Sequence, residues 1–339
     1  MDFEINETSL RIISNDNSEY DLPHLWMRDN CPCNDCRVKE TQEKRFMLNS
    51  VPIDLKPKKV EVNESHIHIV WPDDHETSIC FEEIESLDKS RKPEKVLWTN
   101  DFIPNYFDWN DFLKINDTAI DAISNFITNG VIVIKNAPTI SNSLEELAPR
   151  LGPIREVLFE RIHNVSVDGH VYNIAHTSLE LPPHNDFASY TWPPSVQALH
   201  MLVNECEGGR STIVDGYSVL RDLRRDCPEH FDVLSSFAVP FREFDEENET
   251  YANEPMIRMN AEKEVTGFRY SNQLMQMIDP RKKNVASFYQ AYHELCNRIN
   301  SERYKSKFRL DSGQVLLVSA HRVLHGLSLI HISEPTRPY

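Results

Sequence analysis

The stretch Leu181-Pro-Pro-His-Asn-Asp186 guides the interpretation of the whole sequence. It holds an H-x-D pair, His184 and Asp186, and a second histidine, His325, lies far downstream in the chain. In a strand, residues i and i+2 point to the same side, so His184 and Asp186 can reach one metal ion. Two imidazoles and one carboxylate on one side of a metal, with the opposite side open, are typical of a mononuclear non-haem Fe(II) centre.

The composition is that of an ordinary globular protein with an acidic balance. The chain has 339 residues, of which 40% are hydrophobic and 26% charged, and its formal net charge is −17. This charge disfavours electrostatic binding to nucleic acid or to an anionic membrane. No apolar run approaches the roughly 20 residues that span a bilayer, and the N-terminus lacks the layout of a signal peptide. We therefore expect a cytoplasmic protein whose partners are small molecules.

The pattern of the sequence predicts two domains and a short tail. Residues 1–95 form the first expected domain, in which short strands and turns alternate, as in residues 66–71. Residues 97–110 look like a polar, aromatic-rich link. Strands and helices mix in the second domain, 96–326, and residues 327–339 form the tail.

The second domain contains a clear change from helix to strand. Helical periodicity over residues 121–127 continues to Gly130, which is a natural helix stop, and an apolar strand is expected over 131–135. An amphipathic helix is expected over 287–299. A buried strand over 314–319 leads towards His325.

The first domain carries a thiol-rich motif, Cys31-Pro-Cys-Asn-Asp-Cys36. Three thiolates within six residues are soft ligands at close range and suit Zn(II), which needs a fourth ligand to complete a tetrahedron. The candidates for the fourth ligand are His66, His68, His75 and Cys80. Four protein ligands leave no open position, so such a site is structural. The neighbouring Arg28 is expected in a polar turn rather than in the core.

Taken together, these motifs resemble one family. The chain resembles the gamma-butyrobetaine hydroxylase and trimethyllysine hydroxylase family, within the taurine-dioxygenase-like Fe(II)/2-oxoglutarate oxygenases. The segments that carry the resemblance, in chain order, are Leu25–Cys36, Trp71-Pro-Asp-Asp-His75, Leu151-Gly-Pro-Ile-Arg155, His184-x-Asp186, Gly208-Gly-Arg-Ser211, Val214-Asp-Gly216 and Arg322-Val-Leu-His-Gly326.

The resemblance implies a fold and a set of cofactors. The expected fold is mainly β with flanking helices, a double-stranded β-helix (jelly roll) preceded by a small zinc-binding β domain. The resemblance assigns iron to His184, Asp186 and His325, although His321 competes with His325 for the third place. It implies 2-oxoglutarate as co-substrate, with Ser211 at its far carboxylate, and O₂ as the oxidant. Ascorbate and a homodimer are compatible with it.

The resemblance also assigns the zinc ligands and the substrate pocket. Zinc falls to Cys31, Cys33, Cys36 and His75. In betaine hydroxylases a cage of tyrosines and a tryptophan holds the trimethylammonium group by cation–π attraction. The matching positions here are Phe159, His163, His176 and Phe187, and Asn173 and Asn272 match positions used for the substrate carboxylate. Histidines offer weaker faces to a cation than tyrosine or tryptophan does.

The expected reaction is hydroxylation of a small quaternary amine similar to gamma-butyrobetaine, as in carnitine biosynthesis. The alternatives are a trimethylamino-phosphonate or trimethyllysine as substrate, a non-catalytic zinc-dependent interaction protein, and a cupin-type metal enzyme that does not use 2-oxoglutarate. An interaction protein would bind no ferrous iron at His184, and the cupin-type enzyme would release no succinate.

The tail departs from the family. After Gly326 the family continues to an arginine that pairs with the far carboxylate of 2-oxoglutarate, whereas this chain reads Leu327-Ser-Leu-Ile-His-Ile-Ser-Glu-Pro-Thr-Arg-Pro-Tyr339. That peptide resembles the translation of a sequencing adapter. We therefore expect residues 327–339 to have no native role, Arg337 included, and the oxygenase domain to be incomplete at its C-terminal end.

Overall fold

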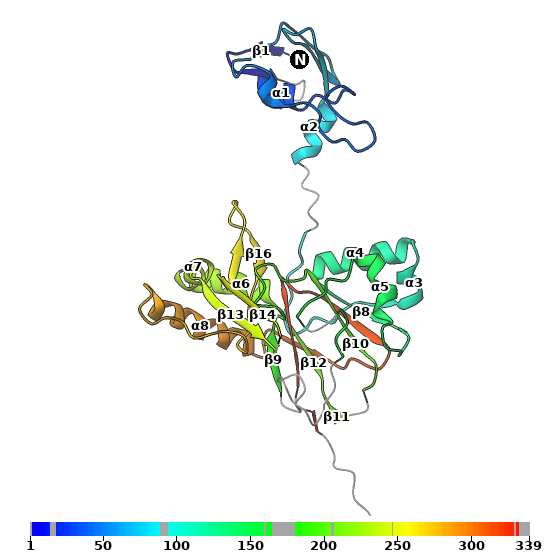
Figure 1. Cartoon of the computed structure of the whole chain (residues 1–339), viewed down its shortest axis with the longest axis vertical. Coiled ribbons are helices and arrows are strands. Elements are labelled where there is room, and N and C mark those ends of the chain that lie inside the picture. The colour runs from blue at the N-terminus through cyan, green and yellow to red at the C-terminus, as the bar shows by residue number, and fades with distance from the viewer. Residues whose placement is uncertain are drawn as a thin grey trace, which may run out of the picture. The chain divides into compact units, whose positions relative to one another are not determined.

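The computed structural model of the chain forms two compact units, Met1–Lys92 and Pro93–Tyr339 (Figure 1). The structure describes residues 2–13, 18–88, 94–158, 161–164, 180–204, 207–245, 247–328 and 330–331. No helix in these ranges has the length and apolar character that a membrane span requires.

The first unit is built from two antiparallel sheets of three strands each, with strand orders β1-β2-β3 and β4-β5-β6. Its strands are β1 (Asp2–Ile5), β2 (Ser9–Ile13), β3 (Glu19–Pro23), β4 (Lys59–Val62), β5 (His66–Val70) and β6 (Glu76–Cys80). Its helices are α1 (His24–Asp29), the 3₁₀ turn η1 (Leu48–Ser50) and α2 (Phe81–Asp88). The alternating strands bury one face, and Leu10, Ile12, Ile67 and Ile69 form the centre of one small core.

The second unit contains more strands than helices. Its strands are β7 (Tyr106–Asp108), β8 (Val131–Lys135), β9 (Leu181–His184), β10 (Val196–Met201), β11 (Glu207–Gly208), β12 (Ser211–Asp215), β13 (Val239–Phe244), β14 (Glu249–Glu254), β15 (Ile257–Met259), β16 (Val265–Phe268), β17 (Lys305–Phe308), β18 (Gln314–Ser319), β19 (Val323–Leu327) and β20 (Ile330–His331). Its helices are α3 (Trp109–Leu113), α4 (Asp117–Asn129), α5 (Leu144–Leu151), α6 (Gly216–Asp226), α7 (Pro228–Ser236) and α8 (Val285–Asn300).

Two four-stranded sheets form a sandwich in this unit, with strand orders β10-β18-β8-β7 and β17-β12-β19-β9. Apolar side chains from both sheets meet between them, including Val133 of β8, Ile213 of β12 and Val323 of β19. Because side chains alternate along a strand, Ile132 and Ile134 of β8 face the other way and pack with α3, α4 and α5. The predicted jelly roll, mainly sheet with flanking helices, is therefore present.

Helices flank the sandwich on both sides. In Figure 1 α3, α4 and α5 gather beside β8, while α6, α7 and α8 lie at the opposite side with the β13–β14 hairpin. Helix α4 ends at Gly130, which adopts the left-handed φ of 78° that favours glycine, and β8 begins at the next residue. The predicted change from helix to strand at Gly130 is thus confirmed.

The interpretation of residues 97–110 as a link was wrong. Trp98, Phe107 and Trp109 are buried, and β7 pairs in parallel with β8 at the edge of the first sheet. The aromatic residues that made the segment look unusual are core residues of the second unit. Because polar, solvent-facing residues separate these aromatic residues, the sequence pattern did not show that they are buried.

The beginning of the expected tail continues regular structure. Leu327 ends β19, and β20 pairs with β11 through Ile330 and His331. Ser328 exchanges hydrogen bonds with the backbone of Arg210 at 2.8 and 3.0 Å. Leu329 and residues 332–339, with Arg337, lie outside the described residues.

Candidate metal centres

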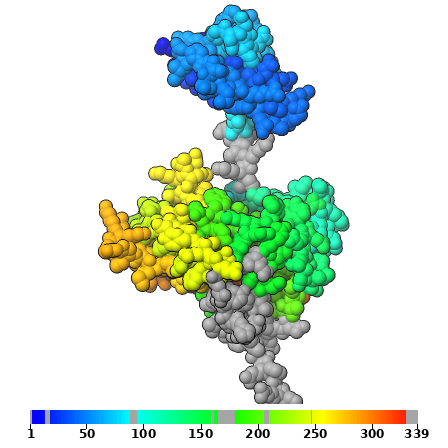
Figure 2. Space-filling view, viewed as in Figure 1, coloured from blue at the N-terminus to red at the C-terminus, as the bar shows by residue number. Residues whose placement is uncertain are grey.

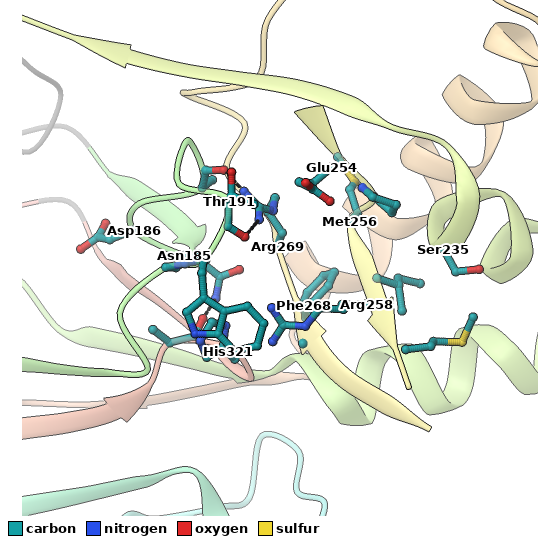
Figure 3. A pocket seen from close by; sticks show the side chains of 18 residues that line it. Asn185, Asp186, Thr191, Ser235, Glu254, Met256, Arg258, Phe268, Arg269 and His321 are labelled. Carbon is teal, nitrogen blue, oxygen red and sulfur yellow. Dashed lines mark hydrogen bonds between the residues drawn. The ribbon is translucent and has the colours of Figure 1, made fainter. Parts of the chain in front are cut away.

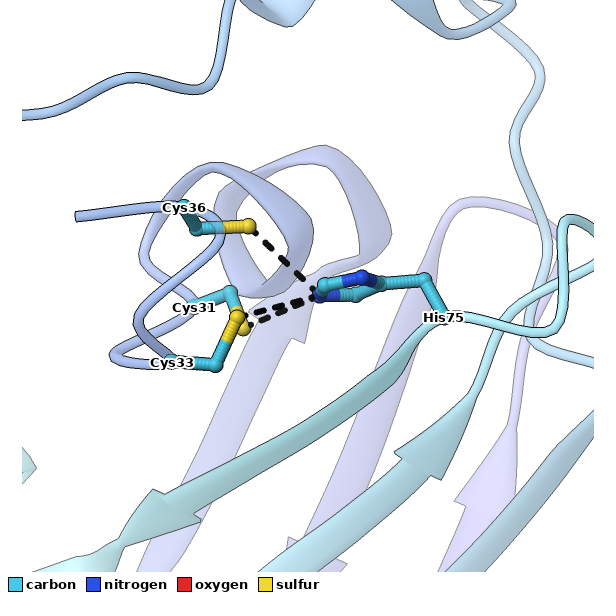
Figure 4. Close-up of side chains that lie close together, drawn as sticks. All are labelled: Cys31, Cys33, Cys36 and His75. Carbon is cyan, nitrogen blue, oxygen red and sulfur yellow. Dashed lines mark hydrogen bonds between the residues drawn. The ribbon is translucent and has the colours of Figure 1, made fainter.

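Four side chains of the first unit converge where the cysteine motif meets the β5–β6 hairpin (Figure 4). The Nε2 atom of His75 lies 3.3 Å from the Sγ of Cys31, 3.7 Å from that of Cys33 and 3.5 Å from that of Cys36. Cys31 and Cys36 are buried, whereas Cys33 and His75 are half-buried. The sequence-predicted ligand set is therefore brought together at one point.

These distances match the edges of a zinc tetrahedron. With bonds of about 2.3 Å to sulfur and about 2.0–2.1 Å to nitrogen, zinc separates its sulfur and nitrogen ligands by about 3.5 Å. Burial raises the pKa of Cys36 to about 11, although a hydrogen bond from Arg28 opposes this. A buried thiolate therefore needs more positive charge than Arg28 provides, and a zinc ion bound here would supply it. The pKa of His75 is lowered by burial and by the charge of Arg28, so the imidazole is in its neutral, ligating form.

Arg28 does not lie in a polar turn as expected. It is 5% exposed at the end of α1, donates a hydrogen bond to Cys36 Sγ at 3.2 Å and stacks over Phe46 at 4.0 Å. Arg28 also approaches Asp73 at 3.5 Å. A guanidinium buried beside thiolates lowers the cost of their charge.

The other candidates for the fourth zinc ligand do not join this cluster in the described part of the chain. The side chains of His66 and His68 stack on one another at 5.8 Å, and Cys80 lies at the end of β6. His75 lies beside the cysteines because the turn between β5 and β6, which carries it, is next to the cysteine motif.

The second cluster lies on the strand pair β9–β19 of the sandwich. His184 and His325 are directly opposite one another in the antiparallel register, so their side chains share one face. Val323, two residues before His325, points into the space between the sheets, so the histidines face the same interior. Gly326 permits this approach, because a Cβ atom there would lie 2.5 Å from the carbonyl oxygen of Leu181.

Asp186 completes the cluster. His184 Nε2 is 3.0 Å from Asp186 Oδ1, and His325 Nε2 is 3.6 Å from Asp186 Oδ2. The two imidazole rings are 4.6 Å apart between centroids. Ligand bonds of roughly 2 Å at right angles separate neighbouring ligand atoms by about 3 Å, so one ion can contact all three side chains.

Two neighbours orient these ligand atoms. His184 Nδ1 lies 3.0 Å from the carbonyl oxygen of Pro182, which can only accept a hydrogen bond, so the neutral ring carries its proton on Nδ1. Gln197 of β10 donates a hydrogen bond to Asp186 Oδ2. When His184 is neutral, the lone pair of its Nε2 would then face a carboxylate oxygen of Asp186, and a cation between the two atoms would relieve the repulsion.

The charges of the three side chains agree with such a role. Burial lowers the pKa of His325 to about 4, although the charge of Asp186 opposes it. Burial also acts to lower the pKa of His184, but the hydrogen bond and charge of Asp186 outweigh it and the pKa is raised. Burial would raise the pKa of Asp186, but the two histidines hold it below its usual range. A carboxylate is therefore available to a metal ion, as is the neutral imidazole of His325.

His321, the competitor of His325, lies elsewhere. It lines a cavity of about 360 Å³ bounded by α7, the β15–β16 hairpin and the loop after Asp186 (Figure 3). Its ring is 5.4 Å from that of Trp192, over which Arg258 stacks at 3.9 Å. Asn185 and Asp186 also line this cavity, so it borders the metal cluster, but His321 does not belong to the cluster.

The predicted co-substrate and substrate residues are only partly placed. Ser211 is buried in β12, and its side chain shares the sheet face of His325 because Ile213, two residues on, pairs with His325. His163 and Phe187 are half-buried, and Phe187 follows the ligand Asp186 with a left-handed φ of 57°. Asn272 is exposed and accepts a hydrogen bond from Tyr292. Phe159, Asn173 and His176 lie outside the described residues.

Three supporting residues were missed at the level of sequence: Arg28, Gln197 and Asn185. Asn185, between the two ligands of the H-x-D pair, donates to the Ala320 and Val323 carbonyls at 2.9 and 3.3 Å and accepts from the Tyr270 amide. It therefore anchors the end of β9 to the turn before β19. The position of this asparagine between two ligands could have indicated a supporting role, but its hydrogen-bond partners lie more than 80 residues away in the sequence.

Two family models cover the chain. Residues 93–329 match the model of the Taurine catabolism dioxygenase TauD, TfdA family, and residues 2–81 match the gamma-butyrobetaine hydroxylase-like N-terminal domain. Among curated proteins, the gamma-butyrobetaine dioxygenase of Pseudomonas sp. (strain AK-1) is 28% identical over 312 residues, covering 89% of this chain and 82% of that protein. The trimethyllysine dioxygenase of Mus musculus mitochondria is 27% identical over 321 residues, covering 89% and 76%.

A solved structure supports the fold alone. The non-heme iron oxygenase OrfP, crystallised with Fe, succinate and (3R,4R)-dihydroxy-L-Arg, superposes with a TM-score of 0.50 at 14% identity and covers 65% of this chain and 77% of that one. The family membership rests on the sequence models, which match in the order that the motifs predicted. The chain therefore belongs to the TauD, TfdA family of dioxygenases, in the group with the gamma-butyrobetaine and trimethyllysine hydroxylases.

Proposed function

We propose that the chain is an Fe(II)- and 2-oxoglutarate-dependent dioxygenase that hydroxylates a small quaternary amine related to gamma-butyrobetaine. The convergence of His184, Asp186 and His325 on one face of a sandwich strand pair carries this proposal. The names of the relatives, gamma-butyrobetaine dioxygenase and trimethyllysine dioxygenase, support the substrate class. The two most plausible substrates are thus gamma-butyrobetaine and trimethyllysine, with a trimethylamino-phosphonate as a third.

The donor set fits ferrous iron. His184, Asp186 and His325 would hold the ion from one side, and no other His, Cys, Asp or Glu of the described residues belongs to this cluster. Iron with 2-oxoglutarate supplies the oxidation of an unactivated C–H bond by O₂. Ser211, on the sheet face that carries His325, would hold the far carboxylate of 2-oxoglutarate by hydrogen bonding.

The remaining residues position these groups and keep water away. Pro182 and Gln197 fix the orientation of His184 and Asp186, which matters because outer partners of metal ligands tune affinity about 10–100-fold. The space between the sheets is lined by Val133, Ile213 and Val323, and this apolar lining limits access of water. Phe187 would offer an aromatic face to the substrate cation.

We further propose that the first unit holds one structural zinc ion through Cys31, Cys33, Cys36 and His75. Four protein ligands leave zinc no open position for chemistry, so its role would be to stabilise the fold of this unit. The division of the chain between Lys92 and Pro93 places the two clusters in different units, which supports separate roles for them.

Succinate release tests the proposed function. The full chain is loaded with Fe(II) and given 2-oxoglutarate, O₂ and one of three amines: gamma-butyrobetaine, trimethyllysine or a trimethylamino-phosphonate. We expect one amine to increase succinate release and to yield an equal amount of hydroxylated product. An Asp186→Ala variant should release none. Iron binding without succinate release under every condition would reject the proposal in favour of a metal enzyme that does not use 2-oxoglutarate.

A further inference from the structure

The β13–β14 hairpin carries one acidic side chain on its inner face. Along β13, Phe241 is fully buried and Glu243 points to the same side, whereas Arg242 points outward and pairs with Glu249 at 2.7 Å. The yellow segment that contains this hairpin is accessible in the space-filling view (Figure 2). Charged residues normally occupy the outer face of such a hairpin, so the inward position of Glu243 requires a reason.

Glu243 lies beside the proposed iron site. Ser189, three residues after Asp186, donates a hydrogen bond to Glu243 Oε2 at 3.4 Å and shares another with Thr250 at 2.8 Å. Burial raises the pKa of Glu243 to about 7; the charge of Asp186 raises it further, and Ser189 and His184 oppose the rise. Glu243 is therefore close enough to the metal ligands to interact with their charges.

The described residues supply no cation to this carboxylate. Within the described residues, Glu243 forms no ion pair, and Ser189 is the only hydrogen-bond partner of its side chain, which leaves Oε1 without a partner. A half-buried carboxylate of this kind is destabilising unless positive charge comes from outside the chain. The proposed substrate class carries a permanent positive charge.

We propose that Glu243 is the counter-ion of the cationic group of the substrate, so that the site selects ligands with a fixed positive charge by a carboxylate as well as by an aromatic face. This inference rests on the proposed function and specifies how its substrate is recognised. Phe187, next to Asp186, supplies the aromatic face from the same loop as Ser189. The carboxylate provides the attraction that His163, at a position expected to hold tyrosine or tryptophan, provides poorly.

A pair of ligands that differ only in charge tests the inference. The amine that drives succinate release is compared with its neutral isostere, in which a tert-butyl group replaces the trimethylammonium group. Dissociation constants are measured by calorimetry on the iron-loaded full chain with 2-oxoglutarate and without O₂. In Glu243→Gln, which keeps the shape and removes the charge, we expect affinity for the amine to fall about 10–100-fold and affinity for the isostere to stay unchanged.

Two controls separate the possible causes. Glu249→Gln, on the outer face of the same hairpin, should bind both ligands as the wild type does. An unchanged iron affinity in Glu243→Gln shows that the variant is folded. Equal losses for the amine and the isostere, or no loss for either, would overturn the inference while leaving the oxygenase assignment intact. Absence of succinate release with every amine in the wild type would instead reject the proposed function.

Discussion

The two clusters of ligand side chains are built in different ways. The cysteine motif and His75 belong to one small unit, and three of the four ligands lie within six residues. His184 and His325 are 325 − 184 = 141 residues apart in the sequence and meet only when β9 pairs with β19. The four ligands of the first cluster would surround an ion, whereas the three of the second would leave one side of it open. A metal at the first site would therefore stabilise local structure, and the second site forms only in the completed fold.

Loss of one zinc ligand should have the largest effect on stability. In Cys36→Ser we expect no bound zinc and unfolding of residues 2–88, because structural zinc contributes about 10–16 kcal/mol of apparent binding free energy to small domains. Zinc analysis and hydrogen exchange of the full chain measure both effects. Cys80→Ser, in the same unit but outside the cluster, is the matched control and should retain zinc. If the first unit stayed folded without zinc, zinc would not be what stabilises it, and the proposed difference in role between the two sites would be wrong.

Loss of one iron ligand should abolish chemistry and leave the fold intact. In His325→Ala we expect iron affinity to fall more than about 100-fold, beyond the 10–100-fold typical of outer partners, with succinate release lost. His321→Ala is the matched control, since His321 lies four residues earlier and lines the neighbouring cavity without belonging to the cluster. The reverse outcome, in which His321→Ala loses iron and His325→Ala retains it, would exchange their roles.

The sequence allowed the ligands to be predicted better than their surroundings. His184 and Asp186 share a side by strand periodicity, and the three cysteines are close in any fold, so these five residues followed from local spacing. His75 and His325 were assigned by the resemblance to a known family. Gln197 and Asn185 contribute through strand register and partners far along the chain, which a single sequence does not specify. The buried aromatic residues of 97–110 were mistaken for a link because polar residues separate them. Arg28 was misplaced because its burial depends on the thiolates beside it.

A more subtle change at Gly326 should separate fold from metal binding. A Cβ atom at this position would lie 2.5 Å from Leu181 O and 3.0 Å from Pro183 N, so Gly326→Ala must push β9 away from β19. His184 would then move relative to His325, and we expect iron affinity to fall about 10–100-fold, as for other disturbed ligand orientations. Iron titration measures this effect. Unchanged affinity would show that the cluster tolerates strand displacement.

The smallest expected effect is a gain in stability at Glu243. Its pKa is raised from 4.5 to about 7 in the folded chain, so the stability that this group contributes is complete below pH 4.5 and is lost as the pH rises through 7. Glutamine does not titrate, so Glu243→Gln should not lose this stability as the pH rises. The iron-free variant should be more stable than wild type by about 1–3 kcal/mol at pH 8 and no more stable at pH 4. Urea unfolding at both values measures the difference, and a gain of equal size at both would exclude titration as its cause.

Nitric oxide is a direct probe of the proposed iron centre, because its binding requires a ferrous ion that keeps an open position. The full chain, loaded with Fe(II) and zinc without O₂, is exposed to nitric oxide and examined by electron paramagnetic resonance. We expect the wild type to give a high-spin iron–nitrosyl signal from one iron per chain. The signal should be absent in His325→Ala and unchanged in Cys36→Ser protein whose second unit remains folded. An iron-loaded wild type that gives no such signal, or a signal that persists in His325→Ala, would contradict an open three-ligand centre at His184, Asp186 and His325.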